Sequence, residues 1–133
     1  MTQQEQVQQD AMQATMQEKM LERINRGVEY LDSNASLFGD WLSAIDIRHL
    51  IMSSGEYCVL GQLGVSFSEF VDRTDMSSTE ASSLGFLLDE EEYGFNETNM
   101  ARYMFIYSQL TELWIVKIVA LRSERSRHNS YQV

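Results

Sequence analysis

The sequence predicts an all-α protein: a compact bundle of about five helices that ends in a long C-terminal helix. Three observations support this prediction. Apolar residues recur at spacings of three and four along most of the chain, proline is absent, and the apolar fraction is 44%. Because a chain of 133 residues can bury roughly two thirds of its unfolded surface, we expect one domain with a packed core.

Composition divides the chain into three parts. Residues 1–13 contain six glutamines and few large apolar side chains, so we expect a flexible glutamine-rich arm there. A single helical domain is predicted over residues 14–125. Residues 126–133 are expected to form a flexible tail.

The first helix of the domain is predicted over residues 14–32. Gly27 lies inside this helix and is expected to weaken it. An apolar stripe at helical spacing defines the face that should pack on the core: Met16, Met20, Ile24, Val28 and Leu31. Met12 extends the methionine pattern, which could lie in the core or at an interface.

A second, shorter helix is predicted over residues 35–45, and a turn at residues 53–55 follows it. Its stripe is Leu37, Phe38, Trp41, Leu42 and Ile45. The next run, residues 57–71, reads as a helix with Gly61 and Gly64 inside it, although residues 58–60 also fit a short strand. We expect the two glycines to allow close approach of another helix rather than to form a hinge.

The residues that begin and end the later helices are easier to identify. Ser77 and Glu80 fit a capping box that starts a short helix, and Gly85 is placed to end it. An acidic loop is expected over residues 89–92. The last helix then follows an apolar stripe of about six turns: Met100, Tyr103, Met104, Tyr107, Leu110, Thr111, Trp114, Ile118 and Leu121.

Charge is strongly segregated along the chain. Residues 28–116 carry fifteen acids and three bases, a net charge of −12, whereas residues 1–27 sum to −1 and residues 117–133 to +3. A field of that sign repels phosphate backbones and anionic lipids, so direct nucleic-acid binding and membrane binding are not expected. It favours a basic partner instead. The single cysteine and the lack of a secretory signal or long apolar run predict a cytoplasmic protein.

Several residue groups invite a chemical interpretation, and each has a simpler structural one. Cys58 could be a nucleophile with His49 as its base, but its apolar neighbours favour a buried thiol. Two acid pairs have spacings that could suit general-acid chemistry, although such spacings are common on helix surfaces: Asp40 with Asp46, and Asp72 with Asp75. We therefore expect no enzyme activity and no cofactor.

Further candidates concern ligands and packing. Residues 89–92 could chelate calcium, but they lack the ligand spacing of a calcium loop, and no metal site is expected. Arg122, Arg125 and Arg127 could touch nucleic acid, but we expect them to complement the negative end of the last helix. Gln62 is expected to tie a helix to a loop, and Trp41 and Trp114 are expected in the core.

A set of short motifs resembles a group of small uncharacterised proteins encoded by actinobacteria and their phages. The motifs are Tyr30-Leu31-Asp32, Trp41, Ile45-Asp46, Cys58-Val59-Leu60-Gly61-Gln62, Gly85-Phe86, Leu110-Thr111, Trp114 and Ile118. The resemblance spans residues 24–122, and residues 58–62 are its most specific segment. It implies a cytoplasmic accessory protein carried by a phage, and it brings no site residue with it.

These expectations combine into a hypothesis of function. We expect a non-enzymatic, acidic protein-binding module that docks on a basic surface of a host protein, with Asp89, Glu90, Glu91 and Glu92 as the partner-binding residues. The alternative is a structural or assembly protein that forms homo-oligomers through its terminal helices. The acidic charge could also serve solubility alone.

Overall fold

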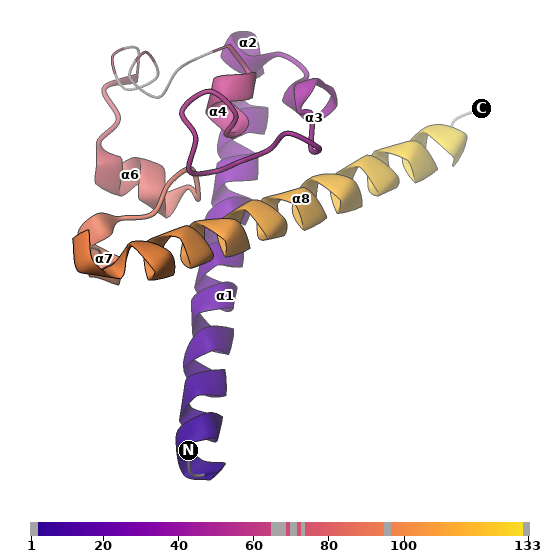
Figure 1. Cartoon of the computed structure of the whole chain (residues 1–133). Helices are drawn as coiled ribbons and strands as arrows, with labels where there is room; N and C mark the ends of the chain where they lie inside the picture. The colour runs from indigo at the N-terminus through magenta and orange to yellow at the C-terminus, as the bar shows by residue number, and fades with distance from the viewer. Residues whose placement is uncertain (1–2, 65–68, 70–71, 73, 95–96, 132–133) are drawn as a thin grey trace.

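Two long helices cross, the N-terminal half of the first extends away from the crossing, and short helices fill the angle between them (Figure 1). The computed structural model describes residues 3–64, 69, 72, 74–94 and 97–131. Within these ranges every regular element is helical, so the all-α fold with a long C-terminal helix is confirmed. Residues 65–68, 70–71 and 73, part of the predicted run 57–71, lie outside the described residues.

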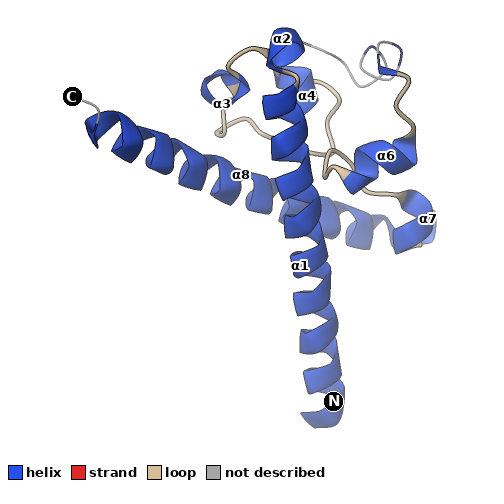
Figure 2. Cartoon of the chain, turned by 180° about the vertical axis from the view of Figure 1, so that it is seen from behind, coloured by secondary structure: helices blue, strands red, loops and turns tan. Residues whose placement is uncertain are grey.

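The elements follow one another in chain order (Figure 2). They are α1 (Gln3–Ser33), α2 (Ala35–Phe38), α3 (Trp41–Ala44), α4 (Val59–Gln62), α6 (Ser78–Ser83), α7 (Glu90–Tyr93), the 3-10 helix η1 (Glu97–Asn99) and α8 (Met100–Tyr131). Helix α1 packs on α2, α6 and α8, and α8 also packs on α3. Both predicted flexible ends are helical over most of their length, because α1 begins at Gln3 and α8 continues to Tyr131.

The core lies where α1 and α8 cross. The predicted stripe of α1 is confirmed, with Met20, Ile24 and Leu31 almost fully buried, and α8 contributes Trp114 and Ile118. The stripe predicted for α8 is only partly correct, because Met100 and Met104 are exposed. Both side chains lie on the exposed side of α8, whereas Ile106 and Tyr107 in the same part of the helix are buried.

Gly27 marks the closest approach in this core. A Cβ atom at this position would collide with the carbonyl oxygen of Leu84 and would lie 3.3 Å from the ring of Trp114. The glycine therefore lets α1 press against the turn that follows α6. Gly27 therefore serves close packing, whereas the sequence suggested only a weak point in the helix.

The helix predicted over residues 35–45 is two helices instead of one. Gly39 has a φ of 62°, a left-handed conformation that interrupts the helix between α2 and α3. Phe38, Trp41, Leu42 and Ile45 are buried as expected, whereas Leu37 is exposed. The break thus lets two short helices turn four apolar side chains into the core.

Helix α4 is much shorter than the run predicted over residues 57–71. Gly64 has a φ of 81°, outside the helical region, and follows the C-cap Leu63. Gly61 does allow a close approach, but its neighbour is the backbone of Gly55 and Glu56 rather than another helix. The predicted turn at residues 53–55 is thereby held against α4.

The Ser77 cap and the Gly85 turn predicted for this short helix, α6, are confirmed, whereas the return hydrogen bond from the Ser77 N–H to the Glu80 side chain is not formed between these described residues. The hydroxyl of Ser77 accepts a hydrogen bond from the Glu80 backbone N–H at 3.1 Å. At the other end Gly85 has a φ of 76°, and the N–H groups of Gly85 and Phe86 donate to the carbonyls of Ser82 and Ala81. This Schellman arrangement reverses the chain and sends it toward α7.

Candidate functional site

The acidic residues 89–92 form a helical turn beside α6, not a loop. The carboxylate of Asp89 accepts hydrogen bonds from the backbone N–H groups of Glu91 and Glu92 at 2.9 and 3.3 Å, and so caps α7. Aspartate is a strong N-cap, and glutamates in the first turn of a helix stabilise it by interacting with the positive end of the helix dipole. Gly94, with a φ of 64°, ends the turn.

A groove of about 440 Å³ lies between α6 and α7. Its lining is Ser78, Thr79, Leu87, Leu88, Asp89, Glu90, Glu91 and Tyr107. The Leu88 N–H donates to the Tyr107 hydroxyl at 3.1 Å, which fastens the segment before α7 to α8. The groove therefore combines three carboxylates and three hydroxyls with two apolar side chains, Leu87 and Leu88.

The four predicted binding residues divide into two pairs. Asp89 caps the helix, and Glu92 forms ion pairs with Lys19 at 2.7 Å and Arg23 at 2.8 Å. Glu90 and Glu91 are exposed, and neither forms a salt bridge with a described residue. Only Glu90 and Glu91 are therefore free to meet a partner's cation.

Two pKa shifts follow from this arrangement. Partial burial acts to raise the pKa of Glu92, but the hydrogen bonds from Lys19 and Arg23 outweigh it, so the pKa is lowered. Burial raises the pKa of Tyr107 to about 12, and the nearby charge of Glu90 adds to that shift. Glu92 is thus held ionised at neutral pH while the Tyr107 phenol stays protonated.

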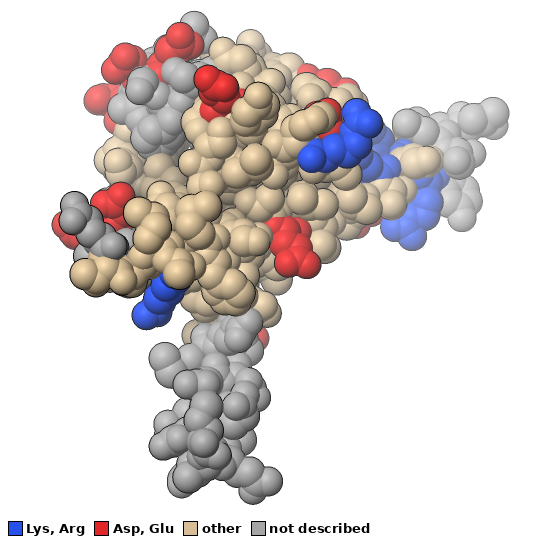
Figure 3. Space-filling model, in the orientation of Figure 1, with Lys and Arg blue, Asp and Glu red and all other residues tan. Residues whose placement is uncertain are grey.

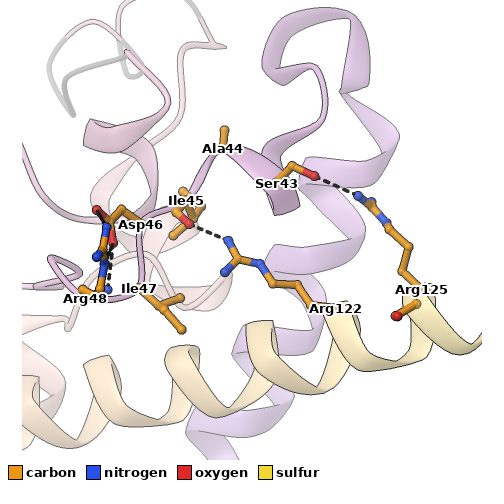
Figure 4. A pocket seen from close by; sticks show the side chains of 9 residues that line it. Ser43, Ala44, Ile45, Asp46, Ile47, Arg48, Arg122 and Arg125 are labelled. Carbon is orange, nitrogen blue, oxygen red and sulfur yellow. Dashed lines mark hydrogen bonds and ion pairs between the residues drawn. The ribbon is translucent and has the colours of Figure 1, made fainter.

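A second hollow, of about 750 Å³, lies between the C-terminal part of α8 and α3 (Figure 4). Arg122 donates from Nε and Nη2 to the Leu42 carbonyl at 3.0 and 2.7 Å, and Nη2 also donates to the Ile45 carbonyl. These carbonyls lie at the C-terminal end of α3. The guanidinium therefore satisfies α3, not the end of α8 as the sequence suggested.

Arg125 completes this contact. Its Nη1 forms an ion pair with Asp40, the residue before α3, at 2.9 Å and donates to the Ser43 hydroxyl at 3.2 Å. Figure 4 shows both arginines reaching from α8 toward α3. Two of the three arginines that could have contacted phosphate thus bond to other residues of the protein, and the third, Arg127, is exposed.

The candidate pair Asp40 and Asp46 does not have the electrostatics of a general acid. Hydrogen bonds from His49 and Arg48 lower the pKa of Asp46 to about 2. Hydrogen bonds from Ser43 and Arg125 likewise lower the pKa of Asp40. A general acid needs a pKa raised toward neutrality, so these two carboxyls carry the opposite perturbation. Asp72 and Asp75 are exposed side chains.

Gln62 performs the structural role predicted for it. Its Oε1 accepts from the Asp46 backbone N–H at 2.6 Å, while Nε2 donates to the backbone carbonyls of Asp46 and Tyr57 at 3.1 Å each. The amide side chain therefore pairs with the loop after α3 as a neighbouring strand would. These bonds link α4 to the loop that contains Asp46.

Cys58 is buried, as the simpler interpretation expected. Its Sγ accepts a hydrogen bond from the Gly61 N–H at 3.4 Å, so the thiol serves as the N-cap of α4. Burial raises the pKa of the Cys58 thiol. His49 is exposed and contacts Asp46 at 2.8 Å, so the histidine is engaged away from the thiol.

No group of three or more His, Cys, Asp or Glu side chains able to hold a metal ion occurs among the described residues. The carboxylates of residues 89–92 are not gathered for calcium, since Asp89 accepts from backbone amides and Glu92 pairs with two cations. The acidic turn therefore presents charge without a chelating geometry.

One surface feature was missed by sequence reasoning. Helix α8 carries an exposed apolar row of Met104, Phe105, Val116 and Val119, whose exposed fractions are 51, 57, 59 and 44%. By length and composition, residues 100–128 could also cross a membrane, although their core-facing side includes the fully buried Trp114 and Ile118. The signal was present in the sequence as Phe105, Val116 and Val119, apolar residues that fall outside the predicted core stripe.

Figure 3 shows how charged side chains are distributed over one face of the molecule. Acidic side chains gather toward α7 and toward the segment between α4 and α6, and basic side chains gather over the C-terminal part of α8. The uncharged surface between them carries single charged groups, one basic toward the N-terminal end of α8 and one acidic near its middle. The linear segregation of charge in the sequence is thus kept in three dimensions.

A scan against protein-family models found no match, and searches of curated proteins and of solved structures found no similar protein.

Proposed function

We propose that this protein is a non-enzymatic binding module that docks on a basic surface of a host protein through the groove between α6 and α7. The observation that carries this proposal is the pair Glu90 and Glu91, two exposed carboxylates at one groove. Ser78 and Thr79 add hydroxyl groups at the same groove. Such a lining suits a lysine or arginine side chain of the partner, whose methylene groups would contact Leu87 and Leu88.

The distribution of ion pairs supports the choice of a basic partner. Within the described part of the chain, intramolecular contacts occupy six cations: Lys19, Arg23, Arg26, Arg48, Arg122 and Arg125. The carboxylates in these ion pairs are four: Glu22, Asp40, Asp46 and Glu92. With a net charge of −10, most of the excess negative charge thus faces outward. It attracts basic surfaces and disfavours nucleic acids and anionic lipids.

We place this docking activity in the cytoplasm of an actinobacterial host, with the protein as an accessory carried by a phage. The resemblance of residues 58–62 to small proteins of that origin supports this context.

A pull-down from an actinobacterial lysate tests the proposal with matched variants. The tagged wild type, a Glu90→Gln/Glu91→Gln variant and a Glu18→Gln/Glu29→Gln control are washed at about 50 mM and about 500 mM salt, which spans strong and weak screening. The control removes the same net charge from exposed sites on α1. We expect one basic protein to be retained at low salt by the wild type and the control and lost by the Glu90/Glu91 variant.

A defined probe makes the same test without a lysate. A fluorescent lysine-rich peptide should bind the wild type and the control alike, and should bind the Glu90/Glu91 variant at least about fivefold more weakly. Equal binding to all three proteins would assign the attraction to overall charge rather than to the groove. Capture that persists at high salt would contradict electrostatic docking.

A second candidate function is structural: assembly into homo-oligomers through the terminal helices. The exposed apolar row on α8 favours it, because Phe105 and Val116 are large apolar side chains that the monomer leaves more than half exposed. Sedimentation of the purified protein across micromolar concentrations tests this function, and a strict monomer would contradict it.

A further inference from the structure

We infer that the exposed face of α8 binds a second copy of this chain, with the two α8 helices antiparallel. The inference rests on the second candidate function, self-assembly, and names the surface and the orientation. Three features of α8 support it: the apolar row, its symmetric placement along the helix, and the opposite charges at the two ends.

The apolar row is self-complementary. Met104 and Phe105 form one apolar pair, and Val116 and Val119 form another, with Ser108 and Glu112 between them on the same exposed side. A two-fold axis across the middle of the row places the first pair of each copy on the second pair of the other. A parallel arrangement would also bring apolar pairs together, so the apolar row allows both orientations and the charges at the ends decide between them.

The charges at the ends of α8 select the antiparallel orientation. The N-terminal end adjoins α7, whose Glu90 and Glu91 are exposed and form no salt bridge with a described residue, whereas Arg127 is exposed near the C-terminal end. Figure 3 shows acidic side chains near α7 and basic side chains over the C-terminal part of α8. Antiparallel pairing brings each basic end beside the acidic end of the other copy, and it also opposes the two helix dipoles.

The length of the helix suits this arrangement. At about 1.5 Å per residue, the 32 residues of α8 extend about 48 Å, so the apolar row and both charged ends fit along one helix pair. The core side of α8 stays on α1 and α3, because Trp114 and Ile118 are fully buried there. Pairing therefore needs no rearrangement of the protein.

Glu112 is the carboxylate within the row. It lies near the midpoint between Phe105 and Val119, so the two copies of Glu112 approach each other across the axis. Two like charges near the axis weaken the pairing of the two helices without preventing it, since both glutamate side chains can stay at the solvent-exposed edge.

Sedimentation equilibrium of the purified full chain tests the surface. We expect a monomer–dimer equilibrium for the wild type, and a dimer dissociation constant raised at least about tenfold by Val116→Glu. Leu37→Glu is the control, because it places the same charge on an exposed apolar residue of α2 and should leave association unchanged. Circular dichroism of both variants checks that the helical fold is intact.

Cysteine cross-linking tests the orientation. In a Cys58→Ser background, a Phe105→Cys variant mixed with a Val116→Cys variant should form a disulfide-linked heterodimer faster than either variant links to itself. Faster linking of each variant to itself would indicate parallel helices and overturn the inference. A dimer that Val116→Glu leaves intact would refute this surface while self-assembly stands, and a strict monomer would refute both.

Vesicle binding provides the remaining outcome. The wild type is sedimented with phosphatidylcholine vesicles, and no co-sedimentation is expected. Co-sedimentation that Val116→Glu removes would assign the apolar row to a lipid surface, and it would overturn pairing with a second copy.

Discussion

The indole N–H of Trp114 donates to the carbonyl oxygen of Gly85 at 2.7 Å. This bond joins α8 to the turn that reverses the chain after α6, and the Trp114 ring stacks on Phe86 with centroids 6.0 Å apart. Gly27 of α1 faces the same turn. Three segments distant in sequence thus meet at one buried tryptophan.

Trp114→Phe should destabilise the protein by about 2 to 4 kcal/mol. The change leaves a buried carbonyl without its donor and opens a cavity in the core. Urea unfolding followed by circular dichroism measures the loss. Trp41→Phe is the comparison, because the Trp41 indole donates to the carboxylate of Asp32, an exposed residue that water can solvate. If the two substitutions cost the same, the Gly85 contact has no special weight.

Gly27→Ala should destabilise the protein by about 1 to 3 kcal/mol, although alanine is the better helix former. The added methyl group collides with the Leu84 carbonyl, so α1 must move away from the turn. Thermal unfolding measures the change. Gly55→Ala serves as the control, since a Cβ there meets nothing within 4 Å. A stabilised Gly27→Ala protein would contradict the close approach.

Arg122→Met should cost about 1 to 3 kcal/mol, because α3 loses the charged donor to its Leu42 and Ile45 carbonyls. Methionine keeps much of the side chain's length and apolar stem. Arg127→Met removes a charge from the same helix at an exposed position and should change the stability by less than about 0.5 kcal/mol. Chemical denaturation of the two variants side by side separates the hydrogen bonds from the effect of net charge.

Asp46 should titrate with a pKa of about 2 in the folded protein, which a ¹³C NMR titration of its carboxyl measures. Because the folded pKa lies below the ordinary value of 3.8, the group contributes stability above that value and loses it as the pH falls toward 2. His49→Ala should raise the Asp46 pKa, since the bond to His49 is the largest cause of the shift. An unchanged Asp46 pKa in that variant would assign the shift to Arg48.

Glu112→Gln should strengthen self-association by about two- to fivefold, because it removes like charges near the two-fold axis and adds no apolar surface. Sedimentation equilibrium at pH 7 measures the change. Glu124→Gln lies beyond the apolar row and removes the same charge, so it should have a smaller effect. Equal strengthening by both changes would indicate general charge repulsion instead.

The sequence could predict the parts of this fold that depend on local pattern. The stripe of Met20, Ile24 and Leu31, the Ser77 cap and the Gly85 turn are all short-range signals, and each is confirmed. The break at Gly39 was missed, because a glycine within an apolar stripe does not reveal its φ.

The candidate site was harder to predict, because contacts between distant residues decide which of its four acids remain free. Composition placed the four acids together, but only the folded chain brings Lys19 and Arg23 to Glu92 and leaves Glu90 and Glu91 free. The same holds for Arg122, whose partners at Leu42 and Ile45 lie about eighty residues earlier. Local spacing suggested a helix end instead, since the negative pole of α8 is close in sequence.

The contact between Arg122 and α3 has a consequence for the order of folding during synthesis. Helix α3 has four residues, too few to persist as an isolated helix, and its end is satisfied by a side chain from the last helix of the chain. The first half of the protein therefore cannot complete its core until the ribosome has released residue 122. Until then its apolar side chains stay accessible to chaperones and proteases, and a chain that stops before α8 should be degraded rather than accumulate.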